Sequence, residues 1–305
     1  MARSTRHPNV QGKTPSGRQA ADRTTGLYAR DAGEGGAVLL LHAVPFNSRM
    51  WGPQFKGLSG KARLIAPDLP GFGLSPMSEV RSLSDYAEAA VDLLDRLGVE
   101  EVVVAGVSSG AYIAFDMIAP LGNRLKGLVI AGAVANPGAE QAPLERHRLA
   151  AEVETGRLDA ASGEYLPKLL DWGAQRSHPE LLSRLKAIAR ENSPAGVAAA
   201  LRAIADRPDF SSILPEIRCP VLCITGAEDP LTAPALMRDM AERIPVSRVA
   251  IVPGAGHLIN LEASEAFNRE LEKFLDETTS LATPAGGDYN AAARREGDAD
   301  TRDRR

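Results

Sequence analysis

The sequence predicts one α/β domain: a doubly wound, mostly parallel sheet with a helical segment inserted between two of its strands. Apolar runs of about four residues recur along the chain without alternating with polar residues, as expected for strands buried on both faces of a parallel sheet. Segments with a helical spacing of apolar residues separate these runs. This β-α-β-α order favours parallel strands with helices on both faces of the sheet.

Six apolar runs are the predicted strands. They are Val38–Leu41, Leu64–Ala66, Val102–Ala105, Leu128–Ala131, Val221–Ile224 and Val249–Val252, and Leu27–Arg30 would add an edge strand. Helices are predicted over the intervening residues 83–97, 109–119, 233–243 and 262–276. The first of these follows Ser82, has Asp85 as a capping-box acid and stops at Gly98, so both of its ends are marked.

The stretch 137–212 breaks this alternation. It contains no apolar strand run, and prolines and glycines divide it into several helical pieces. A helical insertion in an open sheet lies over the carboxyl ends of the strands, where ligands bind, so we expect it to form a cap. The predicted organisation is a core (24–136 and 213–277), this cap, and two disordered tails (1–23 and 278–305) with too few large apolar side chains to fold.

Composition and charge exclude several classes of protein. With 44% hydrophobic and 24% charged residues, the chain has the composition of a folded globular domain, and its net charge of −4 offers no attraction for nucleic acid. We find no run of about 20 apolar residues and no secretory signal, so we expect a cytoplasmic protein that does not bind membranes. Cys219 and Cys223 would lie roughly 13 Å apart on one strand, beyond disulfide reach, and are expected to be buried core thiols.

The first motif with chemical meaning is Gly106-Val107-Ser108-Ser109-Gly110, which follows the strand Val102–Ala105 and precedes a helix. A G-x-S-x-G match alone carries little weight, because glycine and serine are common in turns. In a sharp strand-turn-helix, however, the central serine is lifted above the sheet, and the flanking glycines relieve backbone crowding. The helix N-terminus also favours negative charge that develops beside it. This context makes Ser108 a candidate nucleophile.

A serine hydroxyl needs a base to remove its proton as it attacks. His257 is the predicted base, because it follows the last strand in a glycine-rich loop that can bring its ring over the sheet edge. The base in turn needs an acid to fix its tautomer, and Asp229, which follows the strand Val221–Ile224, is favoured by position over Glu228. The other histidines lie in the tail (His7), in the predicted cap (His147 and His178) and after the first central strand (His42).

The candidates Ser108, Asp229 and His257 therefore follow three separate strands in the chain order Ser, Asp, His. Attack on a carbonyl also creates an oxyanion, which backbone N–H groups must stabilise. One N–H is expected from Ser109, the residue after the nucleophile, and the other from Val44 in the loop after the first central strand. Each such donor typically contributes about 3 kcal/mol of transition-state stabilisation.

Together these residues resemble the α/β-hydrolase superfamily over roughly residues 25–277. The resemblance rests on Leu39-Leu-Leu-His-Ala-Val-Pro, Ala66-Pro-Asp-Leu-Pro-Gly-Phe-Gly-Leu-Ser, the turn at Ser108, the Asp229 loop and Gly256-His-Leu-Ile-Asn-Leu-Glu. It implies the α/β-hydrolase fold and a Ser-His-Asp triad. The substrate stays open, because the family spans esterases, lactonases, C–C bond hydrolases and haloperoxidase-like perhydrolases. His42 and Asp68 resemble turn residues of the family and are expected to be structural.

Two positions depart from the family pattern. Ala43 stands where glycine is usual after the histidine, so we expect it to restrict the backbone that places the Val44 N–H. Ser109 replaces the bulky Met, Leu or Gln that is common after the nucleophile, which leaves the N–H intact but opens the pocket floor. Ser108 itself, where dehalogenase-like and epoxide-hydrolase-like relatives have Asp, argues against those chemistries.

Several side chains beside these positions are candidates for the substrate pocket. They are Phe46, Tyr112, Leu231 and Leu258, which adjoin predicted catalytic positions, and Trp172 and Tyr165 in the predicted cap. Core packing explains each of them equally well from the sequence.

The sequence therefore predicts an acyl hydrolase that acts on a small, fairly apolar carboxylic ester or lactone through an acyl-enzyme, with no metal and no cofactor. Peroxide could replace water as the acceptor, because Pro45 resembles the corresponding loop of haloperoxidase-like relatives, and C–C bond hydrolysis uses the same triad. A hydrolase-fold ligand-binding protein with little turnover is the alternative of another class, with Ala43 in its favour. The expected partner is a small ester-like molecule, and a homo-oligomer is compatible with the sequence.

Overall fold

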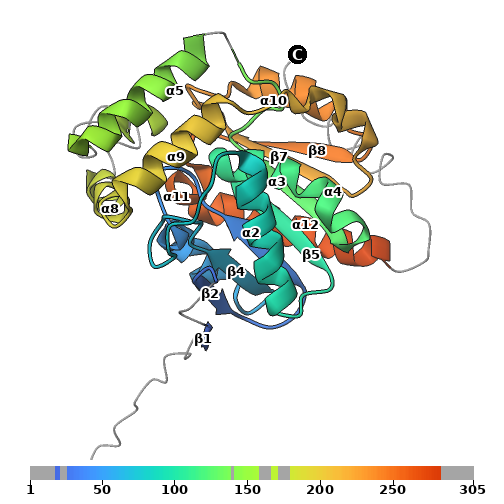
Figure 1. Cartoon of the computed structure of the whole chain (residues 1–305). Helices are drawn as coiled ribbons and strands as arrows, with labels where there is room; N and C mark the ends of the chain where they lie inside the picture. The colour runs from blue at the N-terminus through green and yellow to red at the C-terminus, as the bar shows by residue number, and fades with distance from the viewer. Residues whose placement is uncertain (1–17, 21–25, 139–140, 158–165, 171–178, 283–305) are drawn as a thin grey trace, which may run out of the picture.

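The computed structural model describes residues 18–20, 26–138, 141–157, 166–170 and 179–282 (Figure 1). Eight strands form one sheet in the order β1-β2-β4-β3-β5-β6-β7-β8. Their bounds are β1 Arg18–Ala20, β2 Ala29–Ala32, β3 Ala37–Leu41, β4 Arg63–Pro67, β5 Val102–Val107, β6 Leu125–Ala131, β7 Val221–Gly226 and β8 Ser247–Val252. β2 is antiparallel to β1 and β4, and the other pairs are parallel. The predicted doubly wound, mostly parallel sheet is confirmed.

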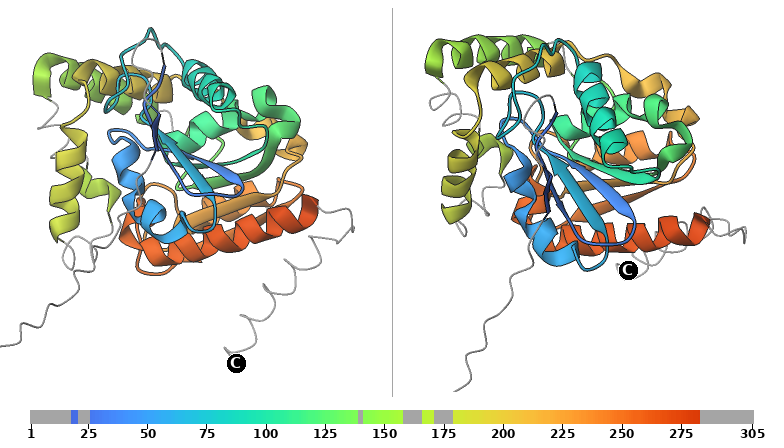
Figure 2. Two further views of the ribbon diagram at one scale, coloured as in Figure 1. Left: turned by 90° about the horizontal axis from the view of Figure 1, so that it is seen from below. Right: turned by 60° about the horizontal axis from the view of Figure 1, so that its bottom comes forward.

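Side chains of the central strands alternate between two hydrophobic clusters, one on each face of the sheet. In β3, Leu39 and Leu41 belong to one cluster, and Val38 and Leu40 belong to the other. The first cluster includes residues of α2 (Leu83–Arg96), α3 (Ser109–Asp116) and α10 (Pro234–Ala241), and the second includes residues of α1 (Gly52–Leu58) and α12 (Ser264–Ala282). Figure 2 shows the sheet between these two helical layers.

Helix α2 begins as the sequence predicts. The backbone N–H of Asp85 donates to Ser82 Oγ (3.3 Å), and the Ser82 N–H donates to the Asp85 carboxylate (2.9 Å). This capping box satisfies N–H groups that have no partner within the helix. The helix ends at Arg96, shortly before Gly98, whose φ is +63°.

The chain between β6 and β7 forms an inserted segment with no strand among its described residues. Its larger described helices are α5 (Gln141–Glu152), α8 (Pro179–Ala189) and α9 (Pro194–Ala205), and its shorter ones are η3 (Val153–Arg157), η4 (Leu166–Leu169), η5 (Phe210–Ser212) and η6 (Leu214–Glu216). Helix α5 packs along α9, and Figure 1 shows these helices together at one end of the molecule. Short helices also occur at η1 (Ser48–Trp51), η2 (Gly122–Arg124) and α11 (Ile259–Glu262).

The helix predicted over 109–119 is interrupted. Helix α3 ends at Asp116, and the separate turn α4 (Ile118–Leu121) follows it. Pro120 explains the break, because it lacks an N–H and its ring crowds the carbonyl of the residue four positions earlier, Asp116.

Both segments predicted to be disordered tails contain some regular structure. Arg18–Ala20 pairs with β2 as β1, because an edge strand offers unpaired N–H and C=O groups to any chain that extends beside it. Helix α12 continues to Ala282, since Thr278 is still buried and packs with Phe274 against Gly127 of β6.

Two expectations about burial hold only in part. Cys223 is fully buried in β7, and burial raises the pKa of its thiol to about 12. Cys219 precedes the strand and is only half-buried, although burial still raises its pKa to about 11. The edge strand β8 is half-buried along most of its length, because only one side of it is covered by a neighbouring strand.

Candidate active site

Ser108 lies at the junction of β5 and α3 with backbone angles of φ 54° and ψ −115°. It is the only non-glycine residue with positive φ in the described part of the chain. Two glycines permit this turn: a Cβ on Gly106 would lie 2.3 Å from the Gly110 backbone, and a Cβ on Gly110 would lie 2.2 Å from the Leu41 carbonyl oxygen. The sharp turn leaves Ser108 half-buried beyond the carboxyl end of β5.

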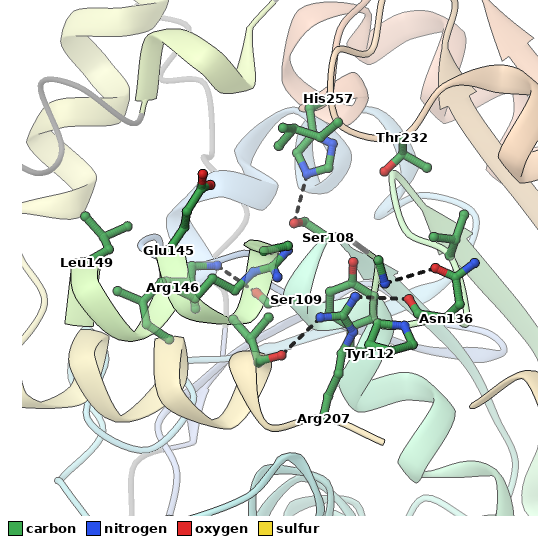
Figure 3. Close-up of a pocket in the computed structure, with 18 of the residues that line it drawn as sticks. Ser108, Ser109, Tyr112, Asn136, Glu145, Arg146, Leu149, Arg207, Thr232 and His257 are labelled. Carbon is green, nitrogen blue, oxygen red and sulfur yellow. Dashed lines mark hydrogen bonds between the residues drawn. The ribbon is translucent and has the colours of Figure 1, made fainter. Parts of the chain in front are cut away.

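The structure joins Ser108, His257 and Asp229 in one chain of hydrogen bonds, part of which Figure 3 shows. Ser108 Oγ donates to His257 Nε2 over 2.9 Å, and His257 Nδ1 donates to the two Asp229 carboxylate oxygens over 3.1 and 3.0 Å. The histidine and aspartate are only 3% and 6% exposed. An imidazole held in this way can take a proton from a hydroxyl while the carboxylate stabilises the imidazolium that forms.

Two backbone N–H groups fix the orientation of the Asp229 carboxylate. The N–H of Leu231 donates to its Oδ1 over 2.8 Å, and the N–H of Thr232 donates to the same atom over 2.9 Å. Its neighbour Glu228 instead accepts a hydrogen bond from the N–H of Ala255 (3.1 Å). Of the two acids that the sequence left in competition, Asp229 is the one that contacts the His257 ring.

The loop that carries His257 is held on both sides of the ring. The Glu262 carboxylate accepts hydrogen bonds from the N–H groups of Gly256 (3.1 Å) and Leu258 (2.9 Å). The N–H of His257 itself donates to the carbonyl of Leu169, in η4 of the inserted segment (3.2 Å). In the sequence Glu262 stands only at the end of a motif, and its role in holding the loop becomes visible through these contacts.

The two predicted oxyanion donors lie together, and one of them already has a protein acceptor. The N–H of Val44 donates to Ser109 Oγ over 2.8 Å, and both residues are buried. The Ser109 N–H lies in the first turn of α3, where N–H groups have no partner within the helix. Ala43 does not have a positive φ, so this position does not require the glycine that the resemblance suggested. A substrate oxygen would have to displace the Ser109 hydroxyl to reach Val44.

His42 and Asp68 have contacts that fit the expected structural role. His42 Nε2 accepts a hydrogen bond from the Leu69 N–H (3.1 Å), and its Nδ1 contacts the carbonyl of the next residue. Complete burial lowers the pKa of His42 to about 4, so its ring is neutral at pH 7. The Asp68 carboxylate accepts from the N–H groups of Ser48 and Leu74, each over 2.8 Å.

A cavity of about 400 Å³ opens over Ser108 and His257. The inserted segment contributes to its wall through α5 and α9, for example with Leu149 and Leu201. The cavity therefore lies between the carboxyl ends of the strands and the inserted helices.

The candidate pocket residues have different positions. Tyr112 and Leu231 line the cavity. Phe46 and Leu258 are instead fully buried in the hydrophobic cluster on the α12 face of the sheet, and neither lines the cavity. Trp172, like Tyr165 and His178, lies outside the described residues.

Three arginines line the cavity, and the sequence singled out none of them; two of these, Arg146 and Arg207, are labelled in Figure 3. Arg146 belongs to α5, and Arg207 follows α9. The Arg207 guanidinium is stacked over the Tyr112 ring at 4.2 Å and donates to the carbonyls of Ile204 (3.0 Å) and Asn136 (3.1 Å). In the sequence Arg207 looks like any solvated residue after a helix, because its burial depends on segments far apart in the chain.

The part of the chain that the structure describes contains no group of three or more His, Cys, Asp or Glu side chains arranged to hold a metal ion. Among the same residues, no helix is both long enough and apolar enough to cross a membrane.

The fold and the arrangement around Ser108 place the chain in a recognised class. The sequence model of the alpha/beta hydrolase family matches residues 38–270, which is well over half of the chain, and the protein belongs to this family. A thermophilic esterase from Thermogutta terrifontis, solved with malate bound, is 32% identical; the match covers 85% of this chain and 97% of that one, with a TM-score of 0.80.

Two further relatives show the range of the family. A (E)-2-((N-methylformamido)methylene)succinate hydrolase of Acinetobacter baylyi is 25% identical over 265 residues, which cover 85% of this chain and 97% of the relative. A bromoperoxidase from Bacillus anthracis is 26% identical, with a TM-score of 0.75 over 86% of this chain and 100% of that one. These similarities support a hydrolase activity.

Proposed function

We propose that the protein is a serine hydrolase that cleaves a small carboxylic ester or lactone through an acyl-enzyme on Ser108. The observation that carries this proposal is the hydrogen-bonded chain from Ser108 through His257 to Asp229, with distances of 2.9 and 3.0 Å. Similarity to an esterase at 32% identity supports the same class of substrate.

In the first half of the reaction, His257 Nε2 takes the Ser108 proton as Oγ attacks the carbonyl carbon. The negative charge that develops on the carbonyl oxygen is stabilised by the N–H groups of Val44 and Ser109. When the tetrahedral intermediate collapses, the bond to the alkoxide breaks and the leaving oxygen receives the proton from the imidazolium. The products are an alcohol, or the opened end of a lactone, and an ester on Ser108.

The second half reverses these proton transfers with water as the nucleophile. His257 takes a proton from water, and the hydroxide adds to the acyl carbon through a second oxyanion in the same place. The Ser108–acyl bond then breaks, Oγ receives the proton, and the carboxylic acid leaves. Asp229, held by two N–H groups, keeps the ring in the required tautomer throughout.

We assign the inserted residues 137–212 the role of a cap. Support comes from α5 and α9, which contribute side chains to the cavity wall, and from the hydrogen bond between Leu169 and His257. A segment in this position excludes water from the reacting atoms and limits the size of the substrate.

A second candidate activity uses peroxide in place of water, which converts the acyl-enzyme into a peracid. Two observations favour it: Pro45 follows the proposed donor Val44, and a bromoperoxidase is 26% identical to this chain. Halogenation of a dye that depends on both hydrogen peroxide and acetate would identify this activity.

The variant Ser108→Ala tests the principal proposal. Removal of the nucleophile is expected to lower kcat on p-nitrophenyl acetate by at least about 10³-fold, because the other groups cannot form an acyl-enzyme. His257→Ala should have a similar effect, and the double variant should be little worse than either, since the two residues act as a unit. Release of p-nitrophenol measures all three.

Ser84→Ala is the matched control, because Ser84 is exposed on α2, away from the cavity. It should retain the activity of the unmodified protein. Equal hydrolysis by that protein and Ser108→Ala would contradict the assignment. Labelling of Ser108 by a fluorophosphonate would count against an inert site, whereas slow single-turnover kinetics would favour a ligand-binding protein.

A further inference from the structure

The cavity over Ser108 contains two guanidinium groups that form no ion pair with any acid in the described part of the chain. Arg207 is only 6% exposed, and Arg146 is half-buried. No carboxylate of the described residues lies within ion-pair distance of either group. Buried arginines in folded proteins are normally paired, so this arrangement requires an explanation.

Each arginine also has a buried N–H group without an acceptor. The Nε of Arg207 and one terminal nitrogen of Arg146, Nη1, are inaccessible to solvent and make no hydrogen bond within the described structure. Native proteins rarely leave such donors unsatisfied, and those that remain often mark a place where a ligand binds.

The nearby acids are occupied or exposed. Asp209 follows Arg207 closely, but its carboxylate accepts a hydrogen bond from the Ser211 N–H (2.8 Å). Glu145 is exposed at the cavity wall. Neither acid forms an ion pair with the two guanidinium groups, although the Asp209 charge acts on Arg207 from a greater distance.

The two positive charges are close enough to affect each other. Burial lowers the pKa of the Arg207 guanidinium from its ordinary value, and the neighbouring charge of Arg146 lowers it further, whereas Tyr112 and Asp209 raise it. Both groups remain charged at pH 7, so they repel each other across the cavity. Figure 3 shows the two side chains reaching this region from different elements. An anion between them would relieve this repulsion.

We propose that Arg207 and Arg146 form a subsite for a carboxylate of the substrate, so that the ester or lactone cleaved at Ser108 carries a free acid group. This inference rests on the proposed function, which defines the bond that is cleaved. It adds that the substrate carries a negative charge. The planar guanidinium fork matches a carboxylate, and stacking on Tyr112 with two bonds to carbonyls holds the Arg207 fork in one orientation.

The first experiment measures binding without catalysis. The Ser108→Ala variant is titrated calorimetrically with glutarate, with its neutral diamide and with inorganic phosphate. Glutarate should bind at least about 10-fold more tightly than the diamide, because hydrogen bonds to a buried cation are strong. Adding Arg207→Gln or Arg146→Gln should remove this difference. Tighter binding of phosphate than of glutarate would overturn the assignment to a carboxylate.

The second experiment measures selectivity in hydrolysis. In one pair, mono-p-nitrophenyl glutarate is compared with p-nitrophenyl valerate, so that the free acid lies on the acyl side. In the other, 4-acetoxybenzoate is compared with phenyl acetate, so that the free acid lies on the alcohol side. The unmodified protein should prefer the acid in at least one pair by about 10-fold or more in kcat/KM. Arg207→Gln and Arg146→Gln should abolish this preference by lowering kcat/KM for the ester that carries the acid.

Arg202→Gln is the matched control, because Arg202 lies on α9 near Arg207 but pairs with Glu154 outside the cavity. It should leave the preference intact. Arg146→Gln keeps the test decisive if Arg207→Gln fails to fold, since Arg146 is only half-buried.

The outcomes separate the two proposals. Hydrolysis of neutral esters with no preference for an acid, and no arginine-dependent binding of glutarate, would overturn the subsite and leave the proposed function standing. Arginine-dependent binding of glutarate without hydrolysis of any ester would overturn the proposed function and leave the subsite standing.

Discussion

Ser109 contributes to the site both through its backbone and through its side chain. Its N–H is one of the two proposed oxyanion donors, and its Oγ accepts the N–H of Val44, which is the other. The free protein thus satisfies this buried N–H with a neighbouring hydroxyl, and substrate binding has to exchange that hydrogen bond for one to the substrate oxygen. A net hydrogen bond of this kind contributes about 0.5–1.5 kcal/mol.

Ser109→Ala is expected to raise kcat/KM, because it removes the competing acceptor and leaves both N–H groups in place. The hydrogen bond that no longer has to be broken corresponds to an increase of roughly 2- to 10-fold. Steady-state hydrolysis of p-nitrophenyl acetate measures the effect. Ser109→Thr keeps the hydroxyl and should show no such increase. A fall in kcat/KM for Ser109→Ala would instead mean that the hydroxyl donates to the oxyanion.

At the scale of elements, the turn between β5 and α3 depends on how closely the helix approaches the sheet. Gly110 brings the first turn of α3 against β3, where the Leu41 carbonyl oxygen leaves no room for a side chain. This close packing fixes the position of Ser108 at the start of the helix. The strained backbone of Ser108 is therefore maintained by contacts between β3, β5 and α3 rather than by the residue itself.

Gly110→Ala should destabilise the protein strongly. Its Cβ would lie 2.2 Å from the Leu41 oxygen, and because both partners are backbone, the helix has to move. We expect a loss of about 2–3 kcal/mol or more in the free energy of unfolding, measured with urea. Gly36→Ala is the control, since a Cβ there meets nothing within 4 Å and the change should stay below about 1 kcal/mol. Equal stabilities would show that the helix relaxes freely.

Elements with local signals could be predicted from the sequence, and others could not. The capping box of α2 and the glycines around Ser108 act within a few residues, so their sequence pattern is sufficient. Pairing of β1 with β2 depends on the free edge of the sheet. The residue types at positions 18–20 therefore do not predict a strand by themselves. The burial of Phe46 in the core was equally hidden, since an apolar residue beside a catalytic loop fits a pocket or a core.

At the scale of the whole molecule, the site is assembled from segments that only the fold brings together. Order along the chain was enough to select Ser108, Asp229 and His257, because each follows a strand and parallel strands end at one edge. The arginine subsite has no such signal. Arg207 is buried because the end of α9 lies beside α3, where its guanidinium stacks on Tyr112, a residue 95 positions earlier in the chain.

Stability of the whole fold is expected to fall in mild acid because of His42. Its pKa is about 4 in the folded protein, owing to burial, against 6.5 in an unfolded chain. Between these values the unfolded chain binds a proton that the folded protein excludes, so acidification below pH 6.5 favours unfolding, and the effect is complete near pH 4. From pH 7.5 to pH 5 the loss should be about 2 kcal/mol.

Urea unfolding at several pH values between 5 and 7.5 measures this loss. His42→Gln should have a flatter dependence on pH, whatever its absolute stability, because the group that takes up the proton is gone. His147→Gln provides the comparison: His147 is exposed, contacts Asp206 at the surface, and should leave the slope nearly unchanged. An unchanged slope of the unfolding free energy against pH in His42→Gln would contradict this prediction. The proton taken up on unfolding would then bind to another group.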